Sequence, residues 1–382
     1  MIQKFNEKIN RKNTSTLKWD NQVNVDCLPF WIADSDYKTY DGVIEELKET
    51  SLVGAFGYNA VPERFSKAVS LWYKKRYNSN VPADAVLPST GVLLIIRILL
   101  DVVTKENDGV IIQTPVYHCF HQMINNMNRK IIENKLIKDN DTYYINYEDL
   151  ENKFKEGHKV LIFCTPHNPV GRVWSKEEIE KVVLLAKKYN VFVIGDEIHS
   201  DLNMGIRKFI SINEFMDVYE NIAICNAPSK TFNLAGLYTS YAIIYSKELQ
   251  EKFTKQVKRD EINRPTVFGY RALIKAYEEG DAWVDAQNEH LKNNYMYLKE
   301  YLNKELPKCV VTKLEGTYLV WLDLSYTNLS TAELLEKCGT AGVTCSGGVQ
   351  FCKDYESYLR FNIACPLDQL KEGLERLVRA LK

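Results

Sequence analysis

Three polar side chains stand at similar places relative to three short apolar segments of the sequence. Asn168, Asp196 and Lys230 each lie at or just beyond the end of such a segment. Lys230 lies among small and uncharged residues in NAPSKTFNLAGL (226–237), and a lysine is costly to bury unless it is paired or used chemically. Asp196 and Lys230 could form a plain salt bridge, or the lysine could be a covalent nucleophile with an acid beside it.

A pyridoxal phosphate site would use all three residues. The lysine amine condenses with the aldehyde of this cofactor, and an aspartate keeps the pyridine nitrogen protonated, so that the ring withdraws electrons. Lys230 and Asp196 are the candidates for these two roles. Asn168 would donate to the phenolic oxygen of the ring, and Tyr117 would stack on its face.

The phosphate of such a cofactor needs backbone donors at the N-terminus of a helix. The apolar run VLLIIRILLDVV (92–103) is interrupted by Arg97 and is too short to cross a bilayer, so it predicts a buried helix. Gly91 and Val92 lie at its start and offer those donors. Because Gly91 has no side chain, a ligand can approach the backbone closely there.

The segments around these residues alternate between strands and helices. Ser175 and Glu178 form a capping box at the start of an amphipathic helix over 175–190. The alternation predicts a mostly parallel sheet covered on both faces, in which ligands bind at the carboxyl ends of the strands. The expected strands are 109–115, 159–166, 191–198, 221–228 and 240–246, and the expected helices before them are 40–50 and 62–77.

The pattern changes after about residue 285. A helical run over 285–306 is followed by strand-like runs at 316–324 and 357–366, which predicts a smaller α+β domain. The expected organisation is an N-terminal segment (1–45) that packs with the small domain, a large cofactor-binding domain (46–284) and the small C-terminal domain (285–382).

Composition limits the class of partner. The 382 residues carry a formal net charge of −1 and no long basic run, which removes the electrostatic reason to expect nucleic acid or an anionic membrane. The nine cysteines form no CxxC pair and the first residues lack the apolar core of a signal peptide, which favours free thiols in the cytoplasm. His118, Cys119 and His121 have no second ligand pair at a familiar spacing, so no metal site is expected.

Motifs along the chain resemble a known family. HNPVGRVW (167–174), DEIHSDL (196–202) and SKTFNLAGL (229–237) resemble, in their order, the fold-type I pyridoxal-phosphate enzymes of the aspartate aminotransferase superfamily. The resemblance implies an α/β fold with a mostly parallel, seven-stranded type of sheet and a smaller α+β domain. A narrower resemblance to the MalY/PatB group of cystathionine β-lyases and cysteine C–S lyases is carried by LPFWIADSDY (28–37), FGY (56–58) and PVYH (115–118).

The resemblance implies further roles beyond the residues that bind the ring. Ser229 would join the phosphate site, and Tyr58 would reach the phosphate from the other subunit of a homodimer. Arg360, in YLRFNIACP, would clamp the substrate carboxylate with its planar fork. Ala33 and Asp34 would lie close to the substrate.

Two departures separate the sequence from the aminotransferase pattern. Many aminotransferases have tyrosine three residues after the aspartate, where this chain has His199, and a phosphate-binding arginine eight residues after the lysine, where it has Tyr238. His199 is therefore expected beside the cofactor as a supporting group. Cys119, in the PVYHC segment, departs instead from the lyase group, much of which is expected to have proline or another residue there, and the sequence alone assigns it no role.

The expected reaction is β-elimination from a sulfur amino acid such as cystathionine or cysteine, with release of pyruvate, ammonia and a thiol. Thiols are acidic enough for the thiolate to be a good leaving group. Transamination is the alternative, because the two reactions share their early steps. A third hypothesis is a protein that keeps the fold and cofactor and also binds a regulator.

Overall fold

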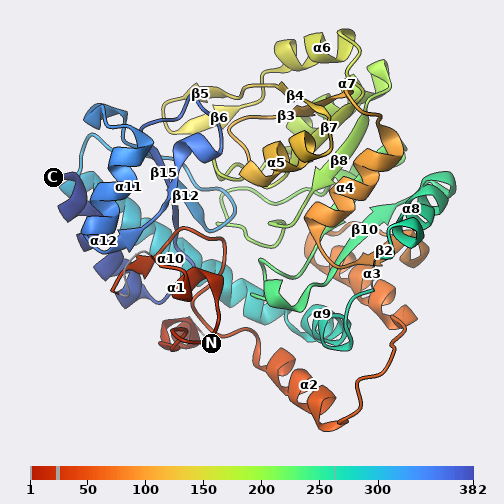
Figure 1. The fold of residues 1–382 in the computed structure, drawn as a ribbon, viewed down its shortest axis with the longest axis horizontal. Helices are drawn as coiled ribbons and strands as arrows, with labels where there is room; N and C mark the ends of the chain where they lie inside the picture. The colour runs from red at the N-terminus through yellow and green to blue at the C-terminus, as the bar shows by residue number, and fades with distance from the viewer. Residues whose placement is uncertain (1, 23–25, 263) are drawn as a thin grey trace.

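The computed structural model of the chain describes residues 2–22, 26–262 and 264–382. A seven-stranded sheet with helices on both faces and a separate four-stranded sheet organise these residues (Figure 1). The strand order of the large sheet is β2–β10–β9–β8–β7–β3–β4. These strands are β2 (Val86–Ser89), β3 (Gly109–Ile112), β4 (Lys130–Glu133), β7 (Val160–Cys164), β8 (Phe192–Asp196), β9 (Ile222–Asn226) and β10 (Ser240–Ile244).

The large sheet is mostly parallel. Strands β4, β3, β7, β8 and β9 run in one direction, whereas β10 is antiparallel to both of its neighbours, β9 and β2. The prediction of a mostly parallel α/β fold of the fold-type I class is therefore confirmed. The sequence pattern did not reveal that β10 is reversed, because its run of apolar residues matches that of a parallel core strand.

Alternate residues of the large sheet enter two different hydrophobic cores. Val193 belongs to one core and Ile194 to the other, and Ile224 and Cys225 divide in the same way. Each of these side chains is buried, which explains why the strands read as continuous apolar runs. The sheet thus forms the middle layer of three, with one hydrophobic core and a layer of helices on each of its faces.

The helices cover the sheet and link it to the rest of the chain (Figure 1). Ser175 caps α7 with its side chain, and the Glu178 side chain completes the predicted capping box. The helices are α1 (Leu17–Asp20), α2 (Asp41–Leu52), α3 (Glu63–Tyr77), α4 (Val92–Val103), α5 (His118–Asn126), α6 (Tyr147–Lys155), α7 (Lys176–Tyr189), α8 (Lys247–Arg259), α9 (Val267–Glu279), α10 (Asp281–Glu305), α11 (Thr331–Thr340) and α12 (Leu367–Leu381). None of the helices in the described ranges is both long and apolar enough to cross a bilayer.

The C-terminal part of the chain forms the four-stranded sheet. Its order is β11 (Val310–Val311), β12 (Leu319–Asp323), β15 (Tyr358–Asn362) and β14 (Ser346–Gly347). A short hairpin pairs β5 (Ile137–Asp139) with β6 (Thr142–Tyr144). β1 (Leu28–Pro29) pairs in parallel with β13 (Val343–Thr344), so residues near the start of the chain lie against its C-terminal part. The exact domain boundaries stay a prediction.

Candidate active site

Asn168, Asp196 and Lys230 lie at neighbouring strand ends of the large sheet. Strands β7, β8 and β9 are adjacent and parallel, with Cys164, Asp196 and Cys225 side by side in register. Asp196 is the last residue of β8, and Asn168 and Lys230 lie in the loops that follow β7 and β9. This is the edge at which sheets of this kind bind ligands.

Asp196 is the buried acid of this edge. The backbone N–H of Ile198 donates to its Oδ1 at 3.2 Å. Burial raises the pKa of Asp196 to about 6, while the Ile198 N–H and the positive charge of Lys230 act in the opposite direction. The carboxylate is therefore mostly ionised at neutral pH and favours a cationic partner.

Lys230 is the amine of the site. Its side chain is half-buried, and Nζ donates to the backbone carbonyl oxygen of Ala33 at 2.7 Å. Burial lowers the pKa of Lys230 to about 8, against the opposing negative charges of Asp34 and Asp196, and the positive charge of Arg360 lowers it further. An amine with this pKa is neutral in part at physiological pH and can act as a nucleophile or a base.

Arg360 is a buried cation whose contacts leave its charge unbalanced. It lies in β15 of the four-stranded sheet, and its side chain stands over the ring of Phe351 at 4.7 Å. Nη1 donates to Asn168 Oδ1 at 3.1 Å, and Nη2 donates to the Trp31 carbonyl oxygen at 2.8 Å and to Ser346 Oγ at 3.3 Å. None of these acceptors is a carboxylate, and the buried Nε has no hydrogen-bond partner among the described residues.

Tyr117 and His199 border the same site. Tyr117 immediately precedes α5 and is half-buried, and burial raises the pKa of its phenol, with Cys119 adding to this effect. His199 is buried, and burial together with the charges of Lys230 and Arg360 holds its pKa well below the ordinary value. The His199 imidazole is therefore neutral, and its Nδ1 has no hydrogen-bond partner in the described part of the chain.

The residues predicted to hold a phosphate lie at the same edge of the sheet. β2 ends at Ser89 and runs parallel to β9, so Gly91 and Val92 begin α4 where the other loops emerge. A Cβ placed on Gly91 would meet no heavy atom within 4 Å, so the space before this helix N-terminus is open. Ser229 is half-buried beside Lys230.

Tyr58 is the predicted site residue that this single chain does not bring to the others. Its side chain is fully exposed, in a loop that follows α2. Tyr238, which stands in place of the aminotransferase arginine, is also exposed and has a positive φ of 47°. Position 238 therefore supplies no positive charge to the proposed phosphate site, unlike the arginine of many aminotransferases.

Sequence reasoning missed three groups that complete the geometry. Ser346 and the Trp31 carbonyl hold Arg360, and Arg11 donates to both carboxylate oxygens of Asp34 at 2.9 and 2.8 Å. The WIADSDY segment was recognised as a motif, but Arg11 lies in an ordinary charged stretch and carries no local signal. Both oxygens of the Asp34 carboxylate thus accept hydrogen bonds from Arg11.

These residues fit pyridoxal phosphate. The site offers an amine of lowered pKa, a buried carboxylate, an open helix N-terminus and a buried arginine with one unpartnered nitrogen. These groups match, in turn, the aldehyde, the ring nitrogen, the phosphate and a substrate carboxylate.

Comparisons with known proteins agree with this geometry. The family described as aminotransferase class I and II matches residues 26–377. Cystathionine beta-lyase PatB of Bacillus subtilis (strain 168) is 34% identical over 99% of both chains. Two solved structures with bound pyridoxal phosphate each match 99% of this chain with a TM-score of 0.95. Cystalysin from Treponema denticola is 33% identical, and 98% of its chain is covered. A protein of Clostridium difficile 630 that is described as an aminotransferase is 36% identical, and 99% of its chain is covered. The chain therefore belongs to the class I and II aminotransferase family and is an enzyme of the pyridoxal-phosphate-dependent, fold-type I kind.

Proposed function

We propose that this enzyme is a carbon–sulfur β-lyase that converts a sulfur amino acid of the cystathionine or cysteine class to pyruvate, ammonia and a thiol. The observation that carries the proposal is that Lys230 and Asp196, at the strand ends of the large sheet, lie near Arg360, which reaches Asn168 at those strand ends from β15 of the four-stranded sheet. The likeness to a cystathionine β-lyase and to cystalysin supports the choice of elimination.

Pyridoxal phosphate, when bound, supplies an aldehyde for the substrate amine and a ring that withdraws electrons from the substrate Cα. Lys230 would hold the cofactor and, once its amine is free, take the Cα proton as general base. The Ala33 carbonyl, at 2.7 Å from Nζ, gives that free amine a fixed position. Asp196 would hold the proton of the ring nitrogen.

Arg360 and Asn168 would orient the substrate and the ring. The fork of Arg360 matches a carboxylate, and its buried Nε, which bonds to none of the described residues, can donate to one. Because Asn168 Oδ1 already accepts from Arg360, the amide NH₂ of Asn168 is left to donate, which is the role proposed for it at the phenolic oxygen. Gly91, Val92 and Ser229 would hold the phosphate.

The first test is to incubate the protein and pyridoxal phosphate with L-cystathionine and L-cysteine separately. Equal amounts of pyruvate and thiol from cystathionine would support the proposal. Formation of pyridoxamine phosphate and a keto acid, without pyruvate and free thiol in equal amounts, would instead identify an aminotransferase. The ratio of rates on the two substrates would indicate the preferred class of leaving thiol.

The pH dependence of turnover follows from Lys230. With a pKa of about 8, the amine is neutral in about one molecule in ten at pH 7 and in most molecules at pH 9. We expect kcat for pyruvate release to rise with pH, to be half-maximal near pH 8 and to level off above about pH 9, since only the neutral amine can accept a proton. A rate that stays constant between pH 6 and 8 would contradict this assignment.

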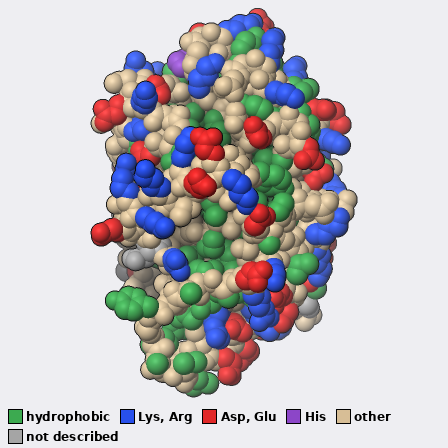
Figure 2. All heavy atoms as spheres, turned by 90° about the vertical axis from the view of Figure 1, so that its right-hand side faces the viewer, with side chains coloured by type: hydrophobic (Ala, Val, Ile, Leu, Met, Phe, Trp, Pro, Cys, Tyr) green, Lys and Arg blue, Asp and Glu red, His purple; other side chains and the backbone are tan. Residues whose placement is uncertain are grey.

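We also propose a homodimer whose interface includes residues 52–58. Leu52, Val53, Phe56 and Tyr58 expose between 60% and all of their side chains, and a monomer rarely exposes so many large apolar groups together. Figure 2 shows hydrophobic side chains gathered on the face that lies at the right of Figure 1. A cytoplasmic location is proposed from the nine free cysteines.

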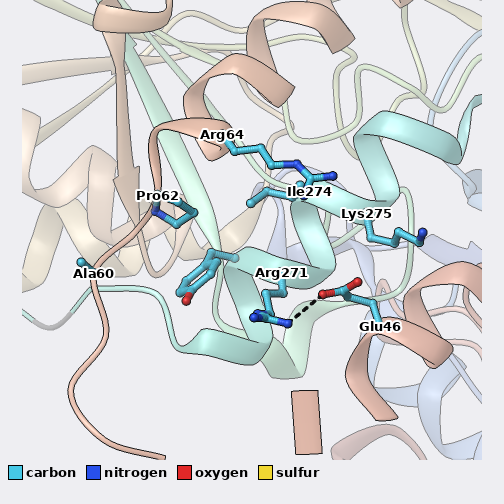
Figure 3. Close-up of a pocket in the computed structure, with 8 residues that line it drawn as sticks. Glu46, Ala60, Pro62, Arg64, Arg271, Ile274 and Lys275 are labelled. Atoms are coloured by element: carbon cyan, nitrogen blue, oxygen red, sulfur yellow. Dashed lines mark hydrogen bonds and ion pairs between the residues drawn. The ribbon is translucent and has the colours of Figure 1, made fainter. Parts of the chain in front are cut away.

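A pocket of about 380 Å³ adjoins this exposed segment, between α2, residues 60–62 and α9 (Figure 3). Ala60 and Pro62 lie on one side of it, and Arg271 and Glu46 lie side by side on the other, where Glu46 Oε1 accepts a hydrogen bond from Arg271 at 3.2 Å. The pocket holds none of the residues of the strand-end site, so we assign it to the proposed interface.

A charge within the apolar segment is expected to separate the subunits. Sedimentation should give the wild-type protein twice the chain mass of 44.2 kDa and Phe56→Asp a single chain mass, because burying an unpaired carboxylate is costly. Leu184→Asp, which adds the same charge at an exposed position of α7, should remain dimeric. A monomeric wild-type protein at micromolar concentration would contradict the dimer.

A further inference from the structure

The Trp31–Tyr37 segment forms one wall of the site through its backbone. The Ala33 carbonyl accepts from Lys230 Nζ at 2.7 Å and the Trp31 carbonyl from Arg360 at 2.8 Å. Further donors hold neighbouring carbonyls of the segment: Asn362 donates to Ile32 at 2.7 Å and to Asp34 at 2.9 Å, and Asn233 donates to Ser35 at 2.9 Å. The two cations of the site thus depend on where this backbone lies.

Arg11, which precedes this segment in the chain, binds residues 34–36 through its guanidinium. Its guanidinium donates to both Asp34 carboxylate oxygens, at 2.9 and 2.8 Å, and this bidentate geometry is the strong form of the pair. Nη1 also donates to the Ser35 carbonyl at 2.8 Å and to Asp36 Oδ1 at 3.1 Å. The side chains of Arg11 and Asp34 expose only 13% and 22% of their surface, so solvent screens the pair weakly.

A second, fully buried ion pair reinforces the first. Lys18 Nζ donates to Asp36 Oδ2 at 2.8 Å and to the Asp34 carbonyl at 2.6 Å, and Trp19 Nε1 donates to Asp36 Oδ1 at 2.8 Å. Two cations therefore face two carboxylates. Because the charges balance, the segment can lie beside Lys230 without presenting a bare carboxylate to it.

We propose that Arg11 is a positioning residue for Lys230: through Asp34 it fixes the Ala33 carbonyl on the lysine amine and neutralises the carboxylate next to it. The proposal rests on the proposed role of Lys230 as the reactive amine, but it concerns the charge around that amine and not the identity of the substrate.

The charges that face Lys230 determine what each substitution should do. Asp34 and Asp196 favour the protonated amine, Cys119 adds to them when it is ionised, and Arg360 acts against them; of these groups Asp34 has the largest effect. Removing Arg11 leaves the Asp34 charge uncompensated and should raise the pKa of Lys230 from about 8. Removing the Asp34 charge should lower it, because Arg11 is then the uncompensated group.

The test uses the full chain freed of cofactor, in which the Lys230 amine is accessible to a reagent. The variants are Arg11→Met, Asp34→Asn, the double variant and Arg11→Lys. The rate at which acetic anhydride acylates Lys230 is followed against pH by mass spectrometry of the peptide, which gives the pKa of the amine directly. Lys38→Met, which breaks an exposed pair with Glu7, is the matched control.

We expect shifts of about one pH unit in opposite directions for Arg11→Met (up) and Asp34→Asn (down). The double variant and Arg11→Lys should return close to the wild-type pKa, and Lys38→Met should not move it. Shifts of the same sign, or no shift in either single variant, would overturn the proposal, since a purely structural role lowers the melting temperature without this pattern. Acylation does not depend on turnover, so failure of the lyase assay would leave this result readable.

Discussion

Replacing Lys230 by alanine is expected to lower the rate of pyruvate release from L-cystathionine by about 10⁴-fold, the upper range for loss of a general base. The variant removes both the amine that holds the cofactor and the group that takes the Cα proton. Binding of the phosphate and the substrate carboxylate relies on other residues, so the variant should still retain cofactor, with an altered visible absorbance.

Folding and specificity controls accompany this variant. Lys252→Ala removes an exposed lysine that pairs with Glu248 on α8, and it should leave the rate unchanged. Circular dichroism and the melting temperature of Lys230→Ala should stay near wild type, because among the described residues the Lys230 side chain has one hydrogen-bond partner, the Ala33 carbonyl. Full turnover by a properly folded Lys230→Ala protein would refute the mechanism.

Replacing Arg360 by methionine is the second large effect, with an expected loss of about 10³-fold in kcat/KM. Methionine keeps much of the apolar contact with Phe351 but cannot hold a carboxylate or donate to Asn168. Breaking a buried charged contact of this kind costs about 3–5 kcal/mol, which corresponds to a factor of this order. Steady-state rates of pyruvate release over a range of L-cystathionine concentrations give the ratio.

Arg360→Lys separates charge from geometry at the same position. Lysine keeps the positive charge but loses the planar fork, so its kcat/KM should lie between those of the wild type and Arg360→Met. Equal losses in both variants would mean that the fork alone matters. A kcat/KM within threefold of wild type in Arg360→Met would show that the substrate carboxylate is bound elsewhere.

The strand-end residues could be predicted from sequence because parallel strands place their carboxyl ends together. Asn168, Asp196 and Lys230 lie at or just beyond the ends of three strands that are adjacent in the sheet, so local patterns along the chain predict that the three residues are close in space. The helix over 92–103 and the capping box at Ser175 were predictable for a similar reason, since both are set by local hydrophobic spacing and hydrogen bonding.

The remaining parts of the site depend on contacts between distant segments. Arg360 meets Asn168 across 192 positions, and Arg11 meets Asp34 through a charge pair that no local pattern distinguishes from a surface pair. Arg360 was reached only through the family resemblance, and Arg11 was not reached at all. The role of the fully exposed Tyr58 was likewise reached only through the family resemblance, because its proposed contact lies on another chain.

The parallel pairing of β1 with β13 has a consequence for how the protein is made. Leu28 pairs with Val343, and the nearby Trp31 carbonyl accepts from Arg360. On the ribosome, the segment that carries Ala33 must therefore wait for more than three hundred further residues before its C-terminal neighbours, among them Val343 and Arg360, emerge. The large sheet can assemble earlier from its own strands, but the amine of Lys230 gains its complete surroundings only near the end of translation, so cofactor capture in the mature site is a late event.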